Sequence, residues 1–249
     1  TYVQEGIGKH KGYEYSRSSN PTRDALEAAL ATLEGGNHGL AFSSGLAAID
    51  AVLMTLKPGD EVIAGDDLYG GTRRLFATHY APLGIQFHFV DTQNVANVSA
   101  HLNERTRLVW LETPTNPLLR VSDIAAIAST LDGHPARLAV DNTFATPALQ
   151  NPLAEGADIV MHSVTKYLGG HSDVVMGALM TKDGTVDAEL RTIQNNVGAI
   201  PGPMDCFLVL RGIKTLGIRV RQHCENGRNV ANWLQAHTKV DKVYWPGFD

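Results

Sequence analysis

Short apolar segments alternate with amphipathic segments along most of this chain, and this alternation constrains its fold more than any other feature. Continuous apolar runs bounded by turn residues are typical of strands that are buried on both faces. Strands that alternate with helices indicate a mainly parallel sheet with helices on both faces, because each connection must return to the same end of the sheet. We therefore expect an α/β fold with a seven-stranded sheet. The expected strands are 39–44, 61–65, 85–90, 107–112, 137–142, 158–163 and 174–180.

Amphipathic segments with start and stop residues predict the helices. The first has Asn20 at a capping position before Pro21 and ends on Gly35 and Gly36. Residues 204–237 have a long helical pattern, which Gly212 and Gly217 interrupt mildly, and 242–245 (KVYW) again resembles a strand. The other expected helices are 45–56, 72–83, 95–102 and 122–131.

Composition narrows the class of protein. The 249 residues suit one large α/β domain, and 43% hydrophobic against 19% charged residues suits a globule with a sizeable core. A net charge of -5 argues against a nucleic-acid partner. No apolar segment reaches the roughly 18 residues of a membrane span, so no membrane partner is expected. Cys206 and Cys224 lack metal-ligand spacing, which predicts no metal site and a reduced, cytoplasmic environment.

Five loops follow the carboxyl ends of expected strands, where ligands collect in sheets of this kind. They are SSGL after Phe42, DDLYGG after Ala64, ETPTNP after Leu111, DNTF after Val140 and SVTKYLGG after Met161. The binding site is expected among these loops.

Lys166 is the lysine that follows an apolar strand and precedes two glycines. In a partly dry place its amine would have a lowered pKa and could attack a carbonyl, as a Schiff-base lysine does. The glycines would let the backbone pass close to a flat ligand. A solvated lysine at a strand end is the alternative.

Three other loops offer groups that suit one cofactor. Ser44, Gly45 and Leu46 begin a helix directly after a strand. Either the backbone N–H groups there bind a phosphate, or these residues only form the turn. Asp141 ends a strand and needs a cation, either an ion-pair partner or a protonated pyridine nitrogen. Tyr69 either stacks on a flat ring or lies at the edge of the core. Together with Lys166 these groups meet the requirements of pyridoxal phosphate.

The chain resembles the cystathionine gamma-lyase and gamma-synthase family of pyridoxal-phosphate-dependent enzymes of cysteine and methionine metabolism, which have the aspartate-aminotransferase-like fold type I. The motifs occur in family order along essentially the whole chain. They are YSRSSNPTR (15–23), AFSSGLAA, DDLYGGT, ETPTNP, VDNTFATP and SVTKYLGGHSDVVMG.

This resemblance implies roles for particular residues. Lys166 would bind the cofactor as a Schiff base, Asp141 would pair with the ring nitrogen, and Tyr69 would stack on the ring and assist proton transfer. Asn116 would lie near the phenolic oxygen and the substrate carboxylate, and Thr143 would line the ring. The phosphate would contact Ser44, Gly45, Leu46, Ser163 and Thr165.

The resemblance also implies an assembly. Tyr15 and Arg17 would reach the phosphate of a neighbouring subunit, in a homodimer with shared active sites or a tetramer. Residues 1–22 would be part of an N-terminal arm, 23–237 the cofactor-binding large domain, and 238–249 the start of a C-terminal small domain. Family members have a longer arm and a small domain that supplies an arginine for the substrate. We therefore expect both ends to continue and the substrate site to be incomplete.

The implied activity is gamma-elimination of L-cystathionine to cysteine, 2-oxobutanoate and ammonia. The gamma-synthase reaction, in which cysteine replaces the acyl group of an O-acyl-homoserine, is the closest alternative, followed by cystathionine beta-lyase and methionine gamma-lyase. Gly71 stands where methionine gamma-lyases commonly have cysteine, which argues against methionine. An inactive cofactor-binding or regulatory protein would lack Lys166 or Asp141. A dinucleotide-dependent dehydrogenase would need GxGxxG, which SSGLAA does not supply.

Overall fold

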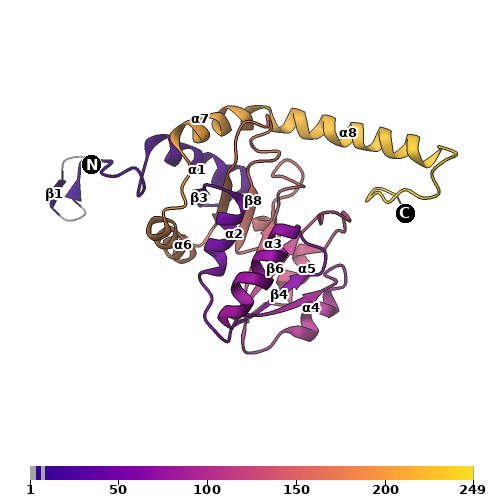
Figure 1. Ribbon diagram of the computed structural model, residues 1–249, viewed down its shortest axis with the longest axis horizontal. Helices are drawn as coiled ribbons and strands as arrows, with labels where there is room; N and C mark the ends of the chain where they lie inside the picture. Colours follow the sequence, from indigo (N-terminus) through magenta and orange to yellow (C-terminus); the bar gives the residue numbers. More distant parts are fainter. Residues whose placement is uncertain (1–3, 7–8, 249) are drawn as a thin grey trace.

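A seven-stranded sheet forms the centre of the molecule in the computed structural model, which describes residues 4–6 and 9–248 (Figure 1). The strand order is β3-β9-β8-β7-β6-β4-β5, and only β9 runs antiparallel to its neighbours. The predicted mainly parallel α/β sheet is therefore confirmed. The strands are β3 (His38–Phe42), β4 (Glu61–Gly65), β5 (Gln86–Val90), β6 (Thr106–Glu112), β7 (Arg137–Asp141), β8 (Ile159–Ser163) and β9 (Gly177–Thr181).

Helices cover both faces of the sheet because successive strand residues point to opposite sides. In β6, Leu108 and Trp110 pack in the core under α2, α3 and α6, whereas Val109 and Leu111 pack in the core under α4 and α5. Helices α1, α7 and the start of α8 cover the β3-β9-β8 part of that second face. The helices are α1 (Pro21–Glu34), α2 (Gly45–Leu53), α3 (Gly70–Leu75), α4 (Val95–His101), α5 (Ile124–Ser129), α6 (Gly184–Val197), α7 (Pro203–Gly212) and α8 (Leu216–Gln235).

Helix α1 begins and ends as its sequence predicts. The side chain of Asn20 accepts hydrogen bonds from the backbone N–H groups of Thr22 at 3.0 Å and Arg23 at 3.4 Å. Gly35 has a φ of 68°, the left-handed conformation that ends many helices.

Two other predictions were incomplete. The expected helix 72–83 divides into α3, a π-helical turn at Phe76–Tyr80 and a 3-10 turn at Ala81–Leu83. Helix α6 was not predicted, although Asp183 caps its start through Thr185 N at 2.7 Å and Gly198 ends it with a φ of 75°.

Two further 3-10 turns occupy Pro152–Ala154 and Ile213–Thr215. Because of the second turn, the long helical segment breaks after Gly212 and not at Gly217.

The strand predicted at 242–245 was wrong. This segment is irregular, and it pairs with no strand of the described chain. Trp245 instead packs against α8, where a Cβ on Gly227 would lie 2.8 Å from the indole ring. The contact with α8 covers part of this large aromatic side chain, and the segment forms no sheet pairing within the described chain.

The N-terminal residues form a small exposed hairpin of β1 (Gln4–Gly6) and β2 (Lys9–His10), which stands away from the sheet (Figure 1). Residues 1–3 and 7–8 of the predicted arm, and residue 249 of the predicted small domain, lie outside the described residues. Among the helices that the structure describes, none combines the length and apolar character needed to cross a membrane.

Candidate active site

A cavity of about 340 Å³ lies where the carboxyl ends of β6, β7 and β8 meet the start of α2. The structure brings ten of the twelve predicted site residues together around it. They are Ser44, Gly45, Leu46, Tyr69, Asn116, Asp141, Thr143, Ser163, Thr165 and Lys166.

The start of α2 forms one end of the cavity. Ser44 caps this helix by accepting a hydrogen bond from Ala47 N at 3.1 Å, and the geometry of a helix start leaves the N–H groups of Gly45 and Leu46 without intrahelical acceptors. A Cβ on Gly45 would lie 3.1 Å from Ser163 Cβ, and a Cβ on Gly177 would lie 2.2 Å from Ser44 O. These glycines let the helix start approach β8 and β9 closely, which suits a phosphate group held between the helix and Ser163.

Asp141 lies at the end of β7 and is only 6% exposed. Thr143 donates to its Oδ1 atom from the hydroxyl at 2.5 Å and from the backbone at 3.0 Å. Burial raises the pKa of Asp141, and the Thr143 bonds oppose this effect. The charge of His162 also acts to lower the pKa of Asp141. Within the described chain Asp141 nevertheless has no salt bridge, and its Oδ2 atom has no hydrogen bond. A protonated ring nitrogen would supply a directly paired cation, so this carboxyl group fits pyridoxal phosphate.

Glu112 is a cavity residue that sequence reasoning missed. It ends β6 directly opposite Asp141, and its two carboxylate oxygens accept hydrogen bonds from Tyr69 N at 2.9 Å and Asn116 N at 2.8 Å. Burial, and then the charge of Asp141, raise the pKa of Glu112 to about 8. The sequence does carry one signal for Glu112: like Asp141, it is an acidic residue at the end of an apolar strand.

Lys166 lies in the turn that follows β8, and its side chain is exposed. The expectation of a partly dry amine is therefore wrong for this chain by itself, because the turn carries the side chain beyond the strand end and leaves it exposed. The turn is nevertheless well fixed. The hydroxyl of Thr165 donates to Met176 O at 3.2 Å and accepts from Met176 N at 3.0 Å.

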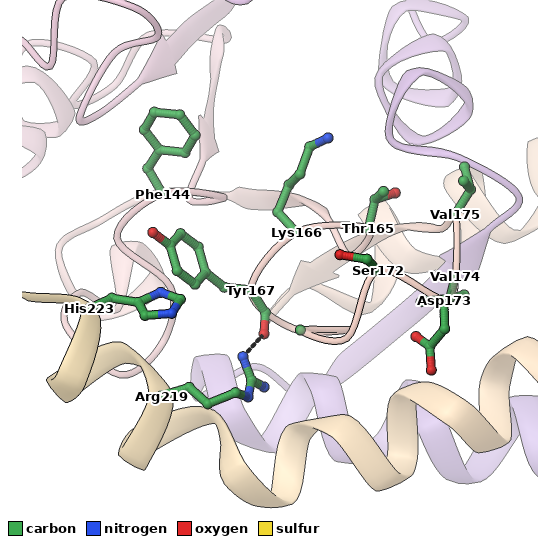
Figure 2. A pocket seen from close by; sticks show the side chains of 11 residues that line it. Phe144, Thr165, Lys166, Tyr167, Ser172, Asp173, Val174, Val175, Arg219 and His223 are labelled. Carbon is green, nitrogen blue, oxygen red and sulfur yellow. Dashed lines mark hydrogen bonds between the residues drawn. The ribbon is translucent and has the colours of Figure 1, made fainter.

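The two glycines after Lys166 make room for protein groups, which corrects the sequence interpretation. A Cβ on Gly169 would lie 2.8 Å from Val174 Cγ1 of the same loop, and a Cβ on Gly170 would lie 2.3 Å from the Arg219 guanidinium carbon. Arg219 donates to Tyr167 O at 2.7 Å and to Gly212 O at 2.9 Å. Figure 2 shows Arg219 of α8 on one side of the turn and the Lys166 side chain pointing away from it.

A second, open hollow of about 700 Å³ lies between this turn and α8 (Figure 2). Lys166 and Thr165 line both this hollow and the smaller cavity. On the α8 side, the Tyr167 ring meets the His223 ring edge to face, with centroids 5.2 Å apart. The turn that carries Lys166 therefore packs on α8 through both its backbone and an aromatic pair.

Tyr69 lies directly before α3 and is 47% exposed. Its ring folds back over Gly71, where a Cβ would lie 2.3 Å from Tyr69 Cε1. The absence of a side chain at Gly71 therefore permits this position of the ring at the cavity.

Tyr15 and Arg17 are the two predicted site residues that do not line the cavity of their own chain. Tyr15 is exposed, and the Arg17 guanidinium lies 5.2 Å from its ring centroid. Arg17 also donates to the backbone oxygen of Asn195 on α6. Their predicted action on a neighbouring subunit stays a prediction.

The profile of a family described as Cys/Met metabolism PLP-dependent enzyme matches residues 1–249. The chain belongs to this family. The predicted family and its cofactor, pyridoxal phosphate (PLP), are thereby confirmed.

Individual members of the Cys/Met metabolism family differ in their named activities. A probable cystathionine gamma-synthase from Herpetosiphon aurantiacus is 52% identical over 99% of this chain and 77% of its own. A cystathionine beta-lyase from Lactococcus lactis subsp. cremoris is 51% identical over 100% of this chain and 66% of its own. The crystal structure of cystathionine gamma-lyase from Lactobacillus plantarum complexed with L-serine has 46% identity and a TM-score of 0.96, with 100% of this chain and 65% of that chain covered. The chain thus spans less than two thirds of the length of the last two relatives.

Proposed function

We propose that the protein containing this chain catalyses the gamma-elimination of L-cystathionine to cysteine, 2-oxobutanoate and ammonia. The observation that carries the proposal is one cavity that holds Lys166, the start of α2 and the buried Asp141, which has no salt bridge to any described residue. These groups match the aldehyde, the ring nitrogen and the phosphate of PLP. The family is a PLP-dependent one, which supports this assignment.

Bound PLP supplies an aldehyde for the substrate amine and a cationic ring that accepts electrons from Cα. The N–H groups of Gly45 and Leu46, with the Ser163 hydroxyl, hold the phosphate. Asp141 keeps the proton on the ring nitrogen, because a buried carboxylate is stabilised by an adjacent cation. Thr143 fixes the orientation of Asp141 through its two hydrogen bonds.

Lys166 would hold the cofactor through its aldehyde, and its Nζ, once free, would act as the general base for the Cα proton of the substrate. Its position on a turn allows the long side chain to reach successive carbon atoms. Tyr69 covers the ring and moves a proton through its hydroxyl, and Asn116 holds the substrate carboxylate. The Thr165 hydroxyl is bonded to Met176, so its contribution to the phosphate requires an exchange of partners.

The proposed assembly is a homodimer with shared sites, or a tetramer built from such dimers. The positions of Tyr15 and Arg17 support this assembly, because both residues lie outside the cavity of their own chain and next to an exposed hairpin. Residues 1–22 are then an arm, 23–237 the large domain and 238–249 the start of a small domain. A cytoplasmic location completes the proposal, on the basis of two widely spaced cysteines.

Cystathionine gamma-synthase activity is the second candidate. The relatives named as synthase and beta-lyase differ in identity by only one percentage point, so similarity does not choose between activities. Gly71 disfavours methionine gamma-lyase activity, since the position is occupied by cysteine in many enzymes that act on methionine.

The test is to supply the purified full-length protein separately with L-cystathionine, with O-succinylhomoserine plus cysteine, and with methionine. Formation of 2-oxobutanoate and cysteine from cystathionine as the fastest reaction is the expected result. Faster formation of cystathionine from the activated homoserine would transfer the assignment to the synthase. Pyruvate and homocysteine from cystathionine would identify a beta-lyase.

A further inference from the structure

Two loops that present site residues are joined by a buried acid. One follows β4 and carries Tyr69, and the other follows β6 and carries Asn116. Glu112 is 7% exposed and joins them, since Oε2 accepts from Tyr69 N at 2.9 Å and Oε1 accepts from Asn116 N at 2.8 Å. Both oxygens are thus used to fix backbone positions in two different loops.

Two more acids join the same loops farther from the cavity. Asp67 Oδ2 accepts from the Thr115 hydroxyl at 2.5 Å and from Leu118 N at 3.1 Å, and Asp66 forms a salt bridge of 3.2 Å with Arg120. Of the three acids, Glu112 is the one that lines the cavity. It is therefore the connection that a bound ligand can influence directly.

Burial and the neighbouring charges together determine whether the Glu112 carboxyl group is ionised. Asp141 faces it from β7 and Asp67 from the β4 loop, while Tyr69 and Lys166 line the same cavity. Burial and the two nearby acids raise its pKa to about 8, so without a further cation the carboxyl group retains a proton near neutral pH. A protonated carboxyl group accepts hydrogen bonds less well than a carboxylate, because one oxygen carries the proton.

We propose that Glu112 is a positioning residue that couples the cation held by Asp141 to the two loops, because the cation favours the carboxylate that holds Tyr69 and Asn116. The inference rests on the proposed pairing of Asp141 with the ring nitrogen of PLP. A positive ring nitrogen offsets the repulsion between Asp141 and Glu112, and the ionised Glu112 then binds both backbone N–H groups more strongly. By reciprocity, the ionised Glu112 also favours the cationic ring.

The experiment measures amide hydrogen exchange at Tyr69 and Asn116 in the full-length protein near neutral pH, with and without PLP. The variants are E112Q and the control E104Q, which makes the same change at an exposed position just before the other end of β6. PLP is expected to slow exchange at both amides about tenfold or more in the wild type and E104Q, and less than about twofold in E112Q. Equal slowing in the wild type and E112Q would overturn the inference.

A second measurement needs no variant, and it decides the matter if E112Q does not fold. The wild type is given a PLP analogue in which C–H replaces the ring nitrogen. The analogue is expected to attach to Lys166 without slowing exchange at Tyr69 and Asn116 as PLP does. Equal slowing by both compounds would refute the coupling while leaving the proposed function intact. Failure of the wild type to retain PLP would overturn both.

Discussion

Glu112 and Asp141 occupy directly opposed positions on the parallel strands β6 and β7, so two buried carboxyl groups share one wall of the cavity. Burial raises the pKa of both groups, and the charge of Asp141 further disfavours ionisation of Glu112. Without a cation, this arrangement is electrostatically unfavourable for the fold at high pH. A cation bound in the cavity is therefore expected to stabilise the folded protein.

The first prediction concerns stability and pH. The folded protein retains a proton on Glu112 up to about pH 8, whereas the unfolded chain loses it near its ordinary value, so folding binds a proton between these limits. The stabilisation is present at low pH and is lost as the pH rises through the folded pKa. The Tm of the cofactor-free protein should fall between about pH 4.5 and pH 8, and less steeply in E112Q. An equally steep fall in E112Q would contradict the assignment.

The second prediction concerns Lys166. The K166A variant should show no PLP attachment that borohydride can fix, and its rate on cystathionine should fall by about 10²–10⁴-fold or more. K57A, which removes an exposed lysine after α2, serves as the control and should behave as the wild type. Mass spectrometry of the reduced protein locates the attachment. Attachment that persists in K166A would mean that another amine binds the aldehyde.

Gly71 and Gly70 form a matched pair for the third prediction. A Cβ at Gly71 would overlap the Tyr69 ring, whereas a Cβ at Gly70 would meet nothing within 4 Å. G71A should displace the ring and lower kcat/KM by roughly 10- to 100-fold, because a small misplacement of a site group has a large kinetic effect. G70A should leave kcat/KM nearly unchanged. Equal losses in both variants would indicate a general disturbance of α3.

The fourth prediction concerns the support of the Lys166 turn by Arg219. R219A leaves the carbonyl groups of Tyr167 and Gly212 without their guanidinium donor, and we expect a loss of about 1–3 kcal/mol in the free energy of unfolding. R221A, an exposed neighbour on α8, should change it by less than about 0.5 kcal/mol. Urea unfolding measures both. A loss in R219A no larger than in R221A would show that the turn holds its position without this contact.

The fifth prediction tests the shared sites. R17A and K166A should each have low activity alone, yet hybrid oligomers formed by co-expression should regain part of it. In a hybrid, one site combines the intact Lys166 of one chain with the intact Arg17 of the other. Absence of recovery in isolated hybrids would show that Arg17 serves its own chain or no site at all.

The fold and most of the cavity could be predicted from the sequence because they depend on local patterns. Alternating strands and helices specify the sheet, and the strand-end rule brings distant residues such as Asp141 and Lys166 to the same edge. The segment 242–245 has a strand pattern but pairs with no strand of the part that the structure describes, and this information is not local. Tertiary packing therefore decided its structure.

The roles of individual residues were less predictable. Glycines 169 and 170 suggested close approach to a ligand, but the group beside Gly170 is Arg219, which lies far along the chain in a helix whose position the sequence does not specify. Glu112 escaped notice because its hydrogen bonds run to backbone groups, and the sequence contains no trace of such partners.

The reversed direction of β9 has a consequence for engineering. Because Ser163 pairs with Gly177, the segment that carries Lys166 leaves the sheet and returns to it at the same point. Its two ends are neighbours in the sheet, but Val164, Leu168, Val174 and Met176 are buried in the core under α1, α7 and α8, so a change in its length would disturb this packing and not the order of the strands. The reach of the Lys166 amine is therefore set by the helices that pack on this segment as well as by the sheet.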